Sequence, residues 1–146
     1  MRGLIQRVSQ ASVSVDNNLV GQIDQGLLLL LGVQKNDTQQ QADKLLQKIV
    51  KYRVFSDQQG KMNDSLLDVG GELLIVSQFT LAADTQKGLR PSFSSAAEPA
   101  IAKDIYHYFV EQAKAIGGIS VQTGIFAADM QVSLVNDGPV TFLLET

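Results

Sequence analysis

The feature that most constrains the fold is a run of five consecutive leucines, Leu27 to Leu31, between Gly26 and Gly32. Successive side chains of a β-strand point to opposite faces of the sheet, so an apolar run of this kind leaves neither face for water. We therefore predict a fully buried central strand over residues 26–33, at the core of the sheet. The run is too short to cross a bilayer, because a membrane-spanning helix needs about 20 apolar residues.

Alternation of apolar and polar residues predicts further strands. Residues 4–15 are expected to form the opening strand and to turn at Asp16-Asn17-Asn18 into a hairpin. Gly70-Gly71 lies between the apolar residues 66–69 and 72–78 and predicts a second hairpin, because primed turns require positive φ. The other predicted strands cover residues 19–23, 52–55, 120–124, 130–135 and 140–144.

Two segments have the periodicity of amphipathic helices. Thr38 and Gln41 have the spacing of a capping box, and apolar residues then recur at helical spacing, which predicts a helix over residues 38–51. Ser95 and Glu98 have the same spacing before a second helix, which we expect to end at Gly117-Gly118. We expect the polar side of the first helix to face water, namely Lys44, Gln47, Lys48 and Lys51.

These elements predict an α+β fold in which a mostly antiparallel β-sheet, open or barrel-like, carries two main helices packed on one face. We expect residues 1–146 to form a single domain, because the chain has 146 residues and shows neither an internal repeat nor a linker. The first residues show no signal-peptide pattern, so we expect a cytoplasmic protein with no membrane partner.

Charge and residue types exclude several kinds of site. The formal net charge of −3 argues against a protein that wraps a long nucleic-acid duplex. The absence of cysteine excludes disulfides, thiolate nucleophiles and most structural zinc sites. The single histidine, His107, lies within the predicted second helix, where we expect a structural or surface role. No spacing typical of metal ligands is present, and we expect neither a metal nor a cofactor.

Two polar motifs interrupt the apolar strands. Ser77-Gln78-Phe79-Thr80-Leu81 directly follows the apolar residues 73–76. Asn136-Asp137-Gly138-Pro139-Val140-Thr141 lies between the last two predicted strands. Proline cannot donate a hydrogen bond to a sheet, so its position there needs a reason, and a trans turn would explain the Gly-Pro step if it stood alone.

Together the two motifs resemble the signatures of the D-aminoacyl-tRNA deacylases, which read Ser-Gln-Phe-Thr-Leu and Asn-x-Gly-Pro-Val-Thr. The resemblance extends over residues 1–146 and includes the opening Met1-Arg2-Gly3-Leu4-Ile5-Gln6-Arg7-Val8 and the loop Lys87-Gly88-Leu89-Arg90-Pro91-Ser92-Phe93. It implies a proofreading hydrolase that cleaves mischarged D-aminoacyl-tRNA, and glycine mischarged on tRNA-Ala, while rejecting L-aminoacyl-tRNA. It also implies a homodimer in which the Gly138-Pro139 step is cis and enters the active site of the partner subunit.

The first motif is expected to carry the chemistry. An aminoacyl ester is already activated, so an enzyme with few acid–base side chains can work by positioning the ester and stabilising the oxyanion. We expect the backbone N–H groups of Phe79 and Thr80 to hold the oxyanion, while Ser77 and Gln78 set the geometry of the loop. The Thr80 hydroxyl is a candidate nucleophile, a group that orients water, or a plain strand residue, and we favour orientation because no base is visible.

The second motif is expected to supply chirality. By resemblance, Gly138 and Pro139, together with Asn136, form a substrate-binding element of the partner's site. Their carbonyl groups would accept hydrogen bonds from the substrate's ammonium group. The motif would then leave no room for the side chain of an L-amino acid. Arg7 either braces this motif, as the resemblance suggests, or is an ordinary surface residue of the opening strand.

Four further residues are candidates for contacts with the 3′ acceptor end of the tRNA. Phe126 and Met130 either contact the terminal adenine or pack in the core. Lys87 and Arg90 either contact phosphates or form an exposed loop tip.

Three other functions are compatible with these residues. One is an editing module like that of threonyl-tRNA synthetases, which would discriminate by a side-chain hydroxyl. Another is a non-catalytic module that captures RNA 3′ ends. The third is a small-molecule-binding dimer, for which the two motifs would be coincidence.

Overall fold

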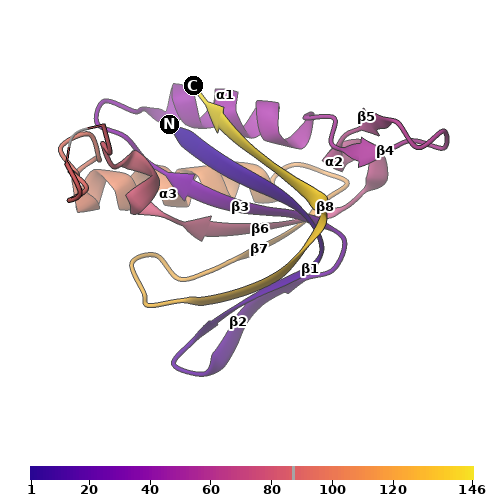
Figure 1. The fold of residues 1–146 in the computed structure, drawn as a ribbon, viewed down its shortest axis with the longest axis horizontal. Coiled ribbons are helices and arrows are strands. Elements are labelled where there is room, and N and C mark those ends of the chain that lie inside the picture. The colour runs from indigo at the N-terminus through magenta and orange to yellow at the C-terminus, as the bar shows by residue number, and fades with distance from the viewer. Residues whose placement is uncertain (87) are drawn as a thin grey trace.

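The computed structural model describes residues 1–86 and 88–146, and its centre is a mixed β-sheet curled nearly into a barrel (Figure 1). The main strands are β1 Arg2–Val15, β2 Asn18–Ile23, β3 Gly26–Gly32, β6 Glu72–Ser77, β7 Ser120–Thr123 and β8 Gln131–Glu145. They follow the order β2-β1-β3-β6-β7, and β8 pairs along β1 as well. A separate small sheet pairs β4 Phe55–Ser56 with β5 Met62–Asp64.

Two main helices, α1 Gln39–Val50 and α3 Pro99–Lys114, pack against each other on one face of the sheet (Figure 1). The expectation of two main helices on one face is therefore confirmed. The chain also forms a single helical turn, α2 Leu66–Val69, and a 3₁₀ helix, η1 Phe79–Ala82. Within the described residues, no helix is both long enough and apolar enough to cross a membrane.

The prediction of a mostly antiparallel sheet has to be corrected to a mixed sheet. Strand β1 is antiparallel to β2, β3 and β8, but the β3–β6 and β6–β7 pairs are parallel. Parallel neighbours need a long crossover, and the segments containing α1 and α3 supply the two crossovers. As a result, the carboxyl ends of β3 and β6 lie at the same edge of the sheet.

The leucine run lies in β3, and the prediction of a buried central strand is confirmed. Leu27, Leu29 and Leu31 belong to the core between the sheet and the two helices. Leu28 belongs to a second core on the opposite face, inside the curve of the sheet. Because both faces of β3 are covered, an apolar residue is favourable at every position of the run.

The capping box of α1 is confirmed and that of α3 is wrong. The Thr38 side chain accepts a hydrogen bond from the N–H of Gln40, and the Gln41 side chain accepts one from the N–H of Thr38 at 3.1 Å. Helix α3 begins only at Pro99 and has no side-chain cap. The Ser95 hydroxyl instead donates to the carbonyl of Ala82, so it ties the preceding loop to η1. The helix ends at Lys114, before the predicted glycines.

The predicted hairpin at Gly70-Gly71 is wrong, because residues 66–69 form helix α2. Ser65 and Asp68 make a capping box at the start of this helix. Gly70 ends it in the left-handed conformation, with φ 58°, and the N–H groups of Gly70 and Gly71 donate to the carbonyls of Leu67 and Leu66. The glycine therefore serves a helix end, not a primed turn. The strand expected at residues 52–55 is also largely absent, since β4 begins at Phe55.

Candidate active site

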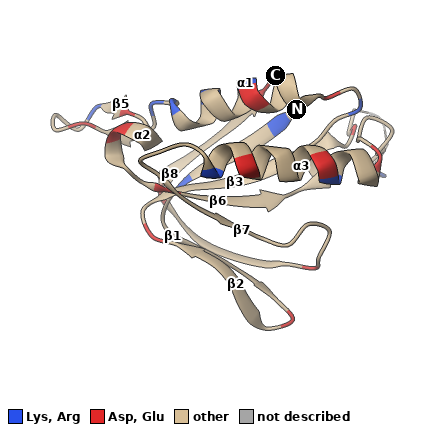
Figure 2. Cartoon of the chain, turned by 180° about the vertical axis from the view of Figure 1, so that it is seen from behind, with Lys and Arg blue, Asp and Glu red and all other residues tan. Residues whose placement is uncertain are grey.

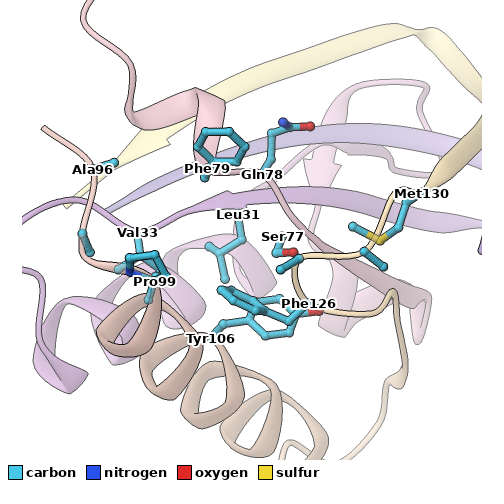
Figure 3. A pocket seen from close by; sticks show the side chains of 14 residues that line it. Leu31, Val33, Ser77, Gln78, Phe79, Ala96, Pro99, Tyr106, Phe126 and Met130 are labelled. Carbon is cyan, nitrogen blue, oxygen red and sulfur yellow. The ribbon is translucent and has the colours of Figure 1, made fainter. Parts of the chain in front are cut away.

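A cavity of about 470 Å³ opens at the edge where β3 and β6 end (Figure 3). It brings together the end of the sheet, the start of α3 and the loop before β8. Its walls are mostly apolar. The lining residues are Leu31, Val33, Ser77, Gln78, Phe79, Ala96, Ala97, Pro99, Ala102, Tyr106, Phe126, Ala127, Ala128 and Met130.

The parallel pairing of β3 with β6 fixes the position of the first motif. Leu31 pairs with Ser77 in the sheet, and the N–H of Gln78 donates to the carbonyl of Leu31 at 2.8 Å. The chain then leaves the sheet and forms η1, so the motif is a strand end followed by a 3₁₀ helix. Ser77, Gln78 and Phe79 all line the cavity, whereas Thr80 is not among the lining residues.

Thr80 and Gln78 form a side-chain pair on this helix. Nε2 of Gln78 donates to the Thr80 hydroxyl oxygen at 2.5 Å. Because that oxygen accepts from Gln78, the hydroxyl proton is directed elsewhere and is free to donate. The N–H groups of Phe79 and Thr80 are the first of η1, and such groups have no partner inside a helix. The motif therefore presents backbone and hydroxyl donors close together.

Phe79 is unusually exposed for its size, with 63% of its surface accessible. Its ring packs against Phe93, with centroids 5.1 Å apart. Phe93 belongs to the loop quoted in the family resemblance, but its contact with the motif was not predicted. Arg90 is exposed in the same loop, and Lys87 lies outside the described residues.

The floor of the cavity contains Tyr106 and Phe126, which the fold brings together from α3 and the loop before β8 (Figure 3). Their ring centroids are 5.4 Å apart, and the ring of the exposed His107 lies 6.4 Å from that of Phe126. The Tyr106 hydroxyl donates to the carbonyl of Ile75 at 3.2 Å, and that carbonyl also accepts from the N–H of Gly124. Tyr106 thus holds α3 against the strand that carries Ser77.

Burial raises the pKa of Tyr106 to about 12. In the unfolded chain this hydroxyl ionises near pH 10, so above that pH the unfolded protein binds fewer protons than the folded one. The neutral Tyr106 hydroxyl therefore contributes to the free energy of unfolding below about pH 10, and this contribution is lost as the pH rises through 12. We expect the loss to approach about 3 kcal/mol in urea unfolding across this range. A Tyr106→Phe variant should lack this loss, and equal losses in both proteins would contradict the assignment.

Phe126 and Met130 both line the cavity, together with Ser77 (Figure 3). The Met130 side chain can pack over residue 124 because that residue is glycine. A Cβ atom at Gly124 would lie only 2.5 Å from the sulfur of Met130. The two side chains predicted to meet the terminal adenine are therefore beside the first motif, although they are far from it in sequence.

The second motif lies elsewhere on the chain. Asn136 to Thr141 is part of the continuous strand β8, not a link between two strands as predicted. The Gly138–Pro139 peptide bond is cis, and both residues are exposed. None of the motif's residues lines the cavity of this chain.

Arg7 and Asn136 hold the shape of this motif. Nε of Arg7 donates to the carbonyl of Asp137 at 3.0 Å, and Nη1 donates to the carbonyl of Val54 at 2.7 Å. The Asn136 side chain accepts from the N–H of Val140 at 3.0 Å and donates to the Thr141 hydroxyl at 2.9 Å. Arg7 is thus more than a surface residue, since its side chain is 13% exposed and is fixed by two carbonyls.

Several cavity residues were not predicted from the sequence. They come from β3 and its end, the first turn of α3 and the segment before it, and the loop before β8, and they are Leu31, Val33, Ala96, Ala97, Pro99, Ala102, Tyr106, Ala127 and Ala128. They carry no polar pattern that could mark them as site residues. The strand–helix–strand order could have pointed to them, because parallel strands joined through helices place their loops at one edge, but the prediction of a mostly antiparallel sheet did not use it.

Comparison with known proteins gives matches along nearly the whole chain. The family model described as D-Tyr-tRNA(Tyr) deacylase matches residues 4–145. A D-aminoacyl-tRNA deacylase of Cellvibrio japonicus (strain Ueda107) is 65% identical over 145 residues, covering 99% of each chain. A protein of the same name from Haemophilus ducreyi (strain 35000HP / ATCC 700724) is 66% identical over 145 residues, again covering 99% of each.

Two solved structures share the fold. One, titled "c-Myc DNA Unwinding Element Binding Protein", is 40% identical, superposes with a TM-score of 0.95 and covers 100% of this chain and 99% of its own. The other, a probable eukaryotic D-amino acid tRNA deacylase, has a TM-score of 0.79 with 99% and 98% coverage. At 17% identity, the second structure is evidence for the fold alone.

Proposed function

This chain belongs to the D-Tyr-tRNA(Tyr) deacylase family, and from that premise we propose that the cavity beside Ser77 and Gln78 is where its reaction takes place. The protein is a hydrolase that cleaves the ester of D-aminoacyl-tRNA. The observation that carries the location is the cavity itself, which is lined by Ser77, Gln78 and Phe79 of the first motif and by Phe126 and Met130. Its apolar walls suit the flat face of a nucleobase.

In the proposed reaction, water adds to the ester carbonyl and the oxygen of the terminal ribose leaves. One proton of the water passes to that ribose oxygen, so the products are the free D-amino acid and the tRNA. The N–H groups of Phe79 and Thr80 hold the oxyanion, because they lack partners within η1. The Thr80 hydroxyl, fixed by Gln78, orients the water, and the neighbouring ribose hydroxyl assists in the same task.

Phe126 and Met130 contact the terminal adenine in this proposal. The ring of Phe126 packs against that of Tyr106, so the Phe126 ring offers a preformed surface for stacking. Aromatic stacking on a base contributes about 1–3 kcal/mol and does not depend strongly on which base is present. The adenine would therefore anchor the substrate while the first motif acts on the ester.

We further propose a homodimer in which Gly138 and Pro139 enter the cavity of the partner subunit. Support comes from their position, because they are exposed and do not line the cavity of their own protomer. Arg7 and Asn136 keep the motif in one shape, as a rigid element for steric selection requires. A glycyl ester has no side chain to exclude, so glycine mischarged on tRNA-Ala is a proposed second substrate. A cytoplasmic location follows from that of aminoacyl-tRNA.

Deacylation of matched D- and L-tyrosyl-tRNA under single-turnover conditions tests this function. We expect the D ester to be cleaved at least about 100-fold faster than the L ester, because the L side chain is excluded from the site. Equal rates would overturn the stereochemical account. Preferential cleavage of L-seryl-tRNA would indicate the threonyl-type editing module instead. Protection of the ester without cleavage would indicate a binding module.

A further inference from the structure

Helix α1 and its C-cap residue present a line of three lysines to solvent, Lys44 and Lys48 within the helix and Lys51 at its C-cap. Lys44, Lys48 and Lys51 follow one another at spacings of four and three residues, which places them on the same side of a helix. The buried residues of the helix lie on the opposite side. With a rise of about 1.5 Å per residue, the line is roughly 10 Å long. From the sequence, these lysines were expected only to be solvated.

Three carboxylates on or beside this helix contact groups other than the three lysines. Asp43 accepts hydrogen bonds from the hydroxyl of Tyr108 at 3.0 and 3.2 Å. Asp37, just before the helix, accepts from the nitrogen of Met1 and from the N–H of Gln34. Glu145, on the neighbouring β8, forms an ion pair with Arg2.

The lysines themselves form no ion pair with any residue that the structure describes. Lys48 donates a hydrogen bond to the main-chain carbonyl of Glu145 at 3.3 Å, and this contact leaves its charge uncompensated. The three positive charges therefore lie together on one surface, and Asp43 is the one carboxylate within α1. They do so on a protein whose net charge is −3, which would be −6 without them.

The other main helix has a different charge pattern. Along α3, Lys103 is followed by Asp104, and Lys114 lies 4.0 Å from Glu111 (Figure 2). The two lysines and the two acidic residues of α3 cancel in net charge, as expected for an ordinary solvated helix. The uncompensated line on α1 therefore differs from the ordinary solvated helix of the same molecule.

We propose that Lys44, Lys48 and Lys51, the lysine line of α1, bind the phosphate backbone of the tRNA acceptor arm. The proposal rests on the proposed function and adds the surface by which the same site receives its substrate. Val33 lies in the wall of the cavity, and Gln34, which forms a bridge with Ala96, continues directly toward α1. The helix thus leads away from the rim of the cavity. A terminal adenine bound there would leave the preceding nucleotides to follow α1.

The charge and its extent fit this partner. A nucleic-acid backbone carries closely spaced charges, one per about 1.7 Å of duplex axis, so a line of about 10 Å meets several phosphates. A protein with net negative charge can bind RNA only where its positive charges are concentrated and unpaired. Within the part of the chain that the structure describes, α1 meets that condition and α3 does not.

The test compares the parent with a Lys44→Gln/Lys48→Gln/Lys51→Gln variant on two substrates. The first is D-tyrosyl-tRNA, and the second is 3′-D-tyrosyl-adenosine, which has the ester but no phosphate. For the tRNA we expect kcat/KM to fall on the order of tenfold through KM, with kcat unchanged. The slope of log kcat/KM against log salt should become smaller by about 2–3, since each lost phosphate contact removes about 0.7–0.9. For the adenosine ester we expect no change.

A matched control removes the same kind of charge from the other helix. The pair Lys103→Gln/Lys114→Gln is compared with the pair Lys44→Gln/Lys48→Gln, and only the α1 pair should change the salt slope. Equal effects of the two pairs, or an unchanged slope in the triple variant, would overturn the proposal. So would a change of molecular mass in light scattering, because α1 would then be an interface between copies. Failure of the proposed function is recognised separately, since the parent would then leave both D esters intact.

Discussion

A Thr80→Val enzyme should hydrolyse D-aminoacyl-tRNA on the order of 10²–10³ times more slowly than the parent, with substrate affinity nearly unchanged. Valine keeps the shape of the side chain and removes the hydroxyl that Gln78 fixes at 2.5 Å. If this hydroxyl orients the attacking water, its loss affects the transition state far more than the bound ester. Single-turnover rates at saturating enzyme, together with the enzyme concentration for half-maximal rate, separate the two effects.

A Thr80→Ser variant is the matched control, because it keeps the hydroxyl and loses only the methyl group. We expect it to retain most of the parent rate. If valine and serine give equal, near-parental rates, the hydroxyl has no chemical role and only the backbone N–H groups of η1 remain as candidates. If serine is as slow as valine, the methyl packing is what matters, and orientation of water is excluded.

The second large effect is expected from Gly138→Ala, which should lower deacylation by on the order of 100-fold while the protein stays folded. Gly138 has φ 133°, a conformation that residues with a side chain rarely adopt. A Cβ atom there would lie 2.7 Å from Cγ2 of Val140 and 3.0 Å from Nη2 of Arg7. The motif and Arg7 must therefore shift, which disturbs the element that is proposed to select the substrate. Because Gly138 is exposed, circular dichroism should show an unchanged fold.

Mixing the two inactive variants tests whether the site is shared between subunits. In a mixed dimer of Gly138→Ala and Thr80→Val chains, one of the two sites combines an intact Thr80 with an intact Gly138 from the other chain. Mixing after denaturation and refolding should therefore restore activity in that half of the sites. If each site used the motif of its own chain, every site would carry one defect and mixing would restore nothing.

Local features of the fold followed from the sequence where the signal lies within a few residues. The Thr38–Gln41 capping box and the apolar period after it are properties of a single helix, and α1 has them as predicted. The Gly70-Gly71 step shows the limit of such signals. Positive φ at glycine is required both by primed turns and by helix ends, and only the Ser65–Asp68 box distinguishes the two.

The sequence predicted the cavity residues of the first motif, Phe126 and Met130, but not the rest of the apolar lining. Ser77 and Gln78 have residue types that suggest chemistry, and they line the cavity with Phe126 and Met130. Tyr106 and Pro99 line the same cavity, but an aromatic residue and a proline at a helix start have equally good structural reasons to be there. Their part in the site depends on where α3 packs.

By itself, the sequence determined the buried strand, the two helices, the family and the residues of both motifs, because these depend on residue type and on spacing along the chain. Only the tertiary structure decided that β3 and β6 run parallel, that a cavity lies at their ends, and that Gly138 and Pro139 do not line it. The reason is that pairing between distant strands is set by which surfaces bury the most apolar area together. The buried apolar area depends on the whole folded chain, so it cannot be deduced from any short stretch of residues.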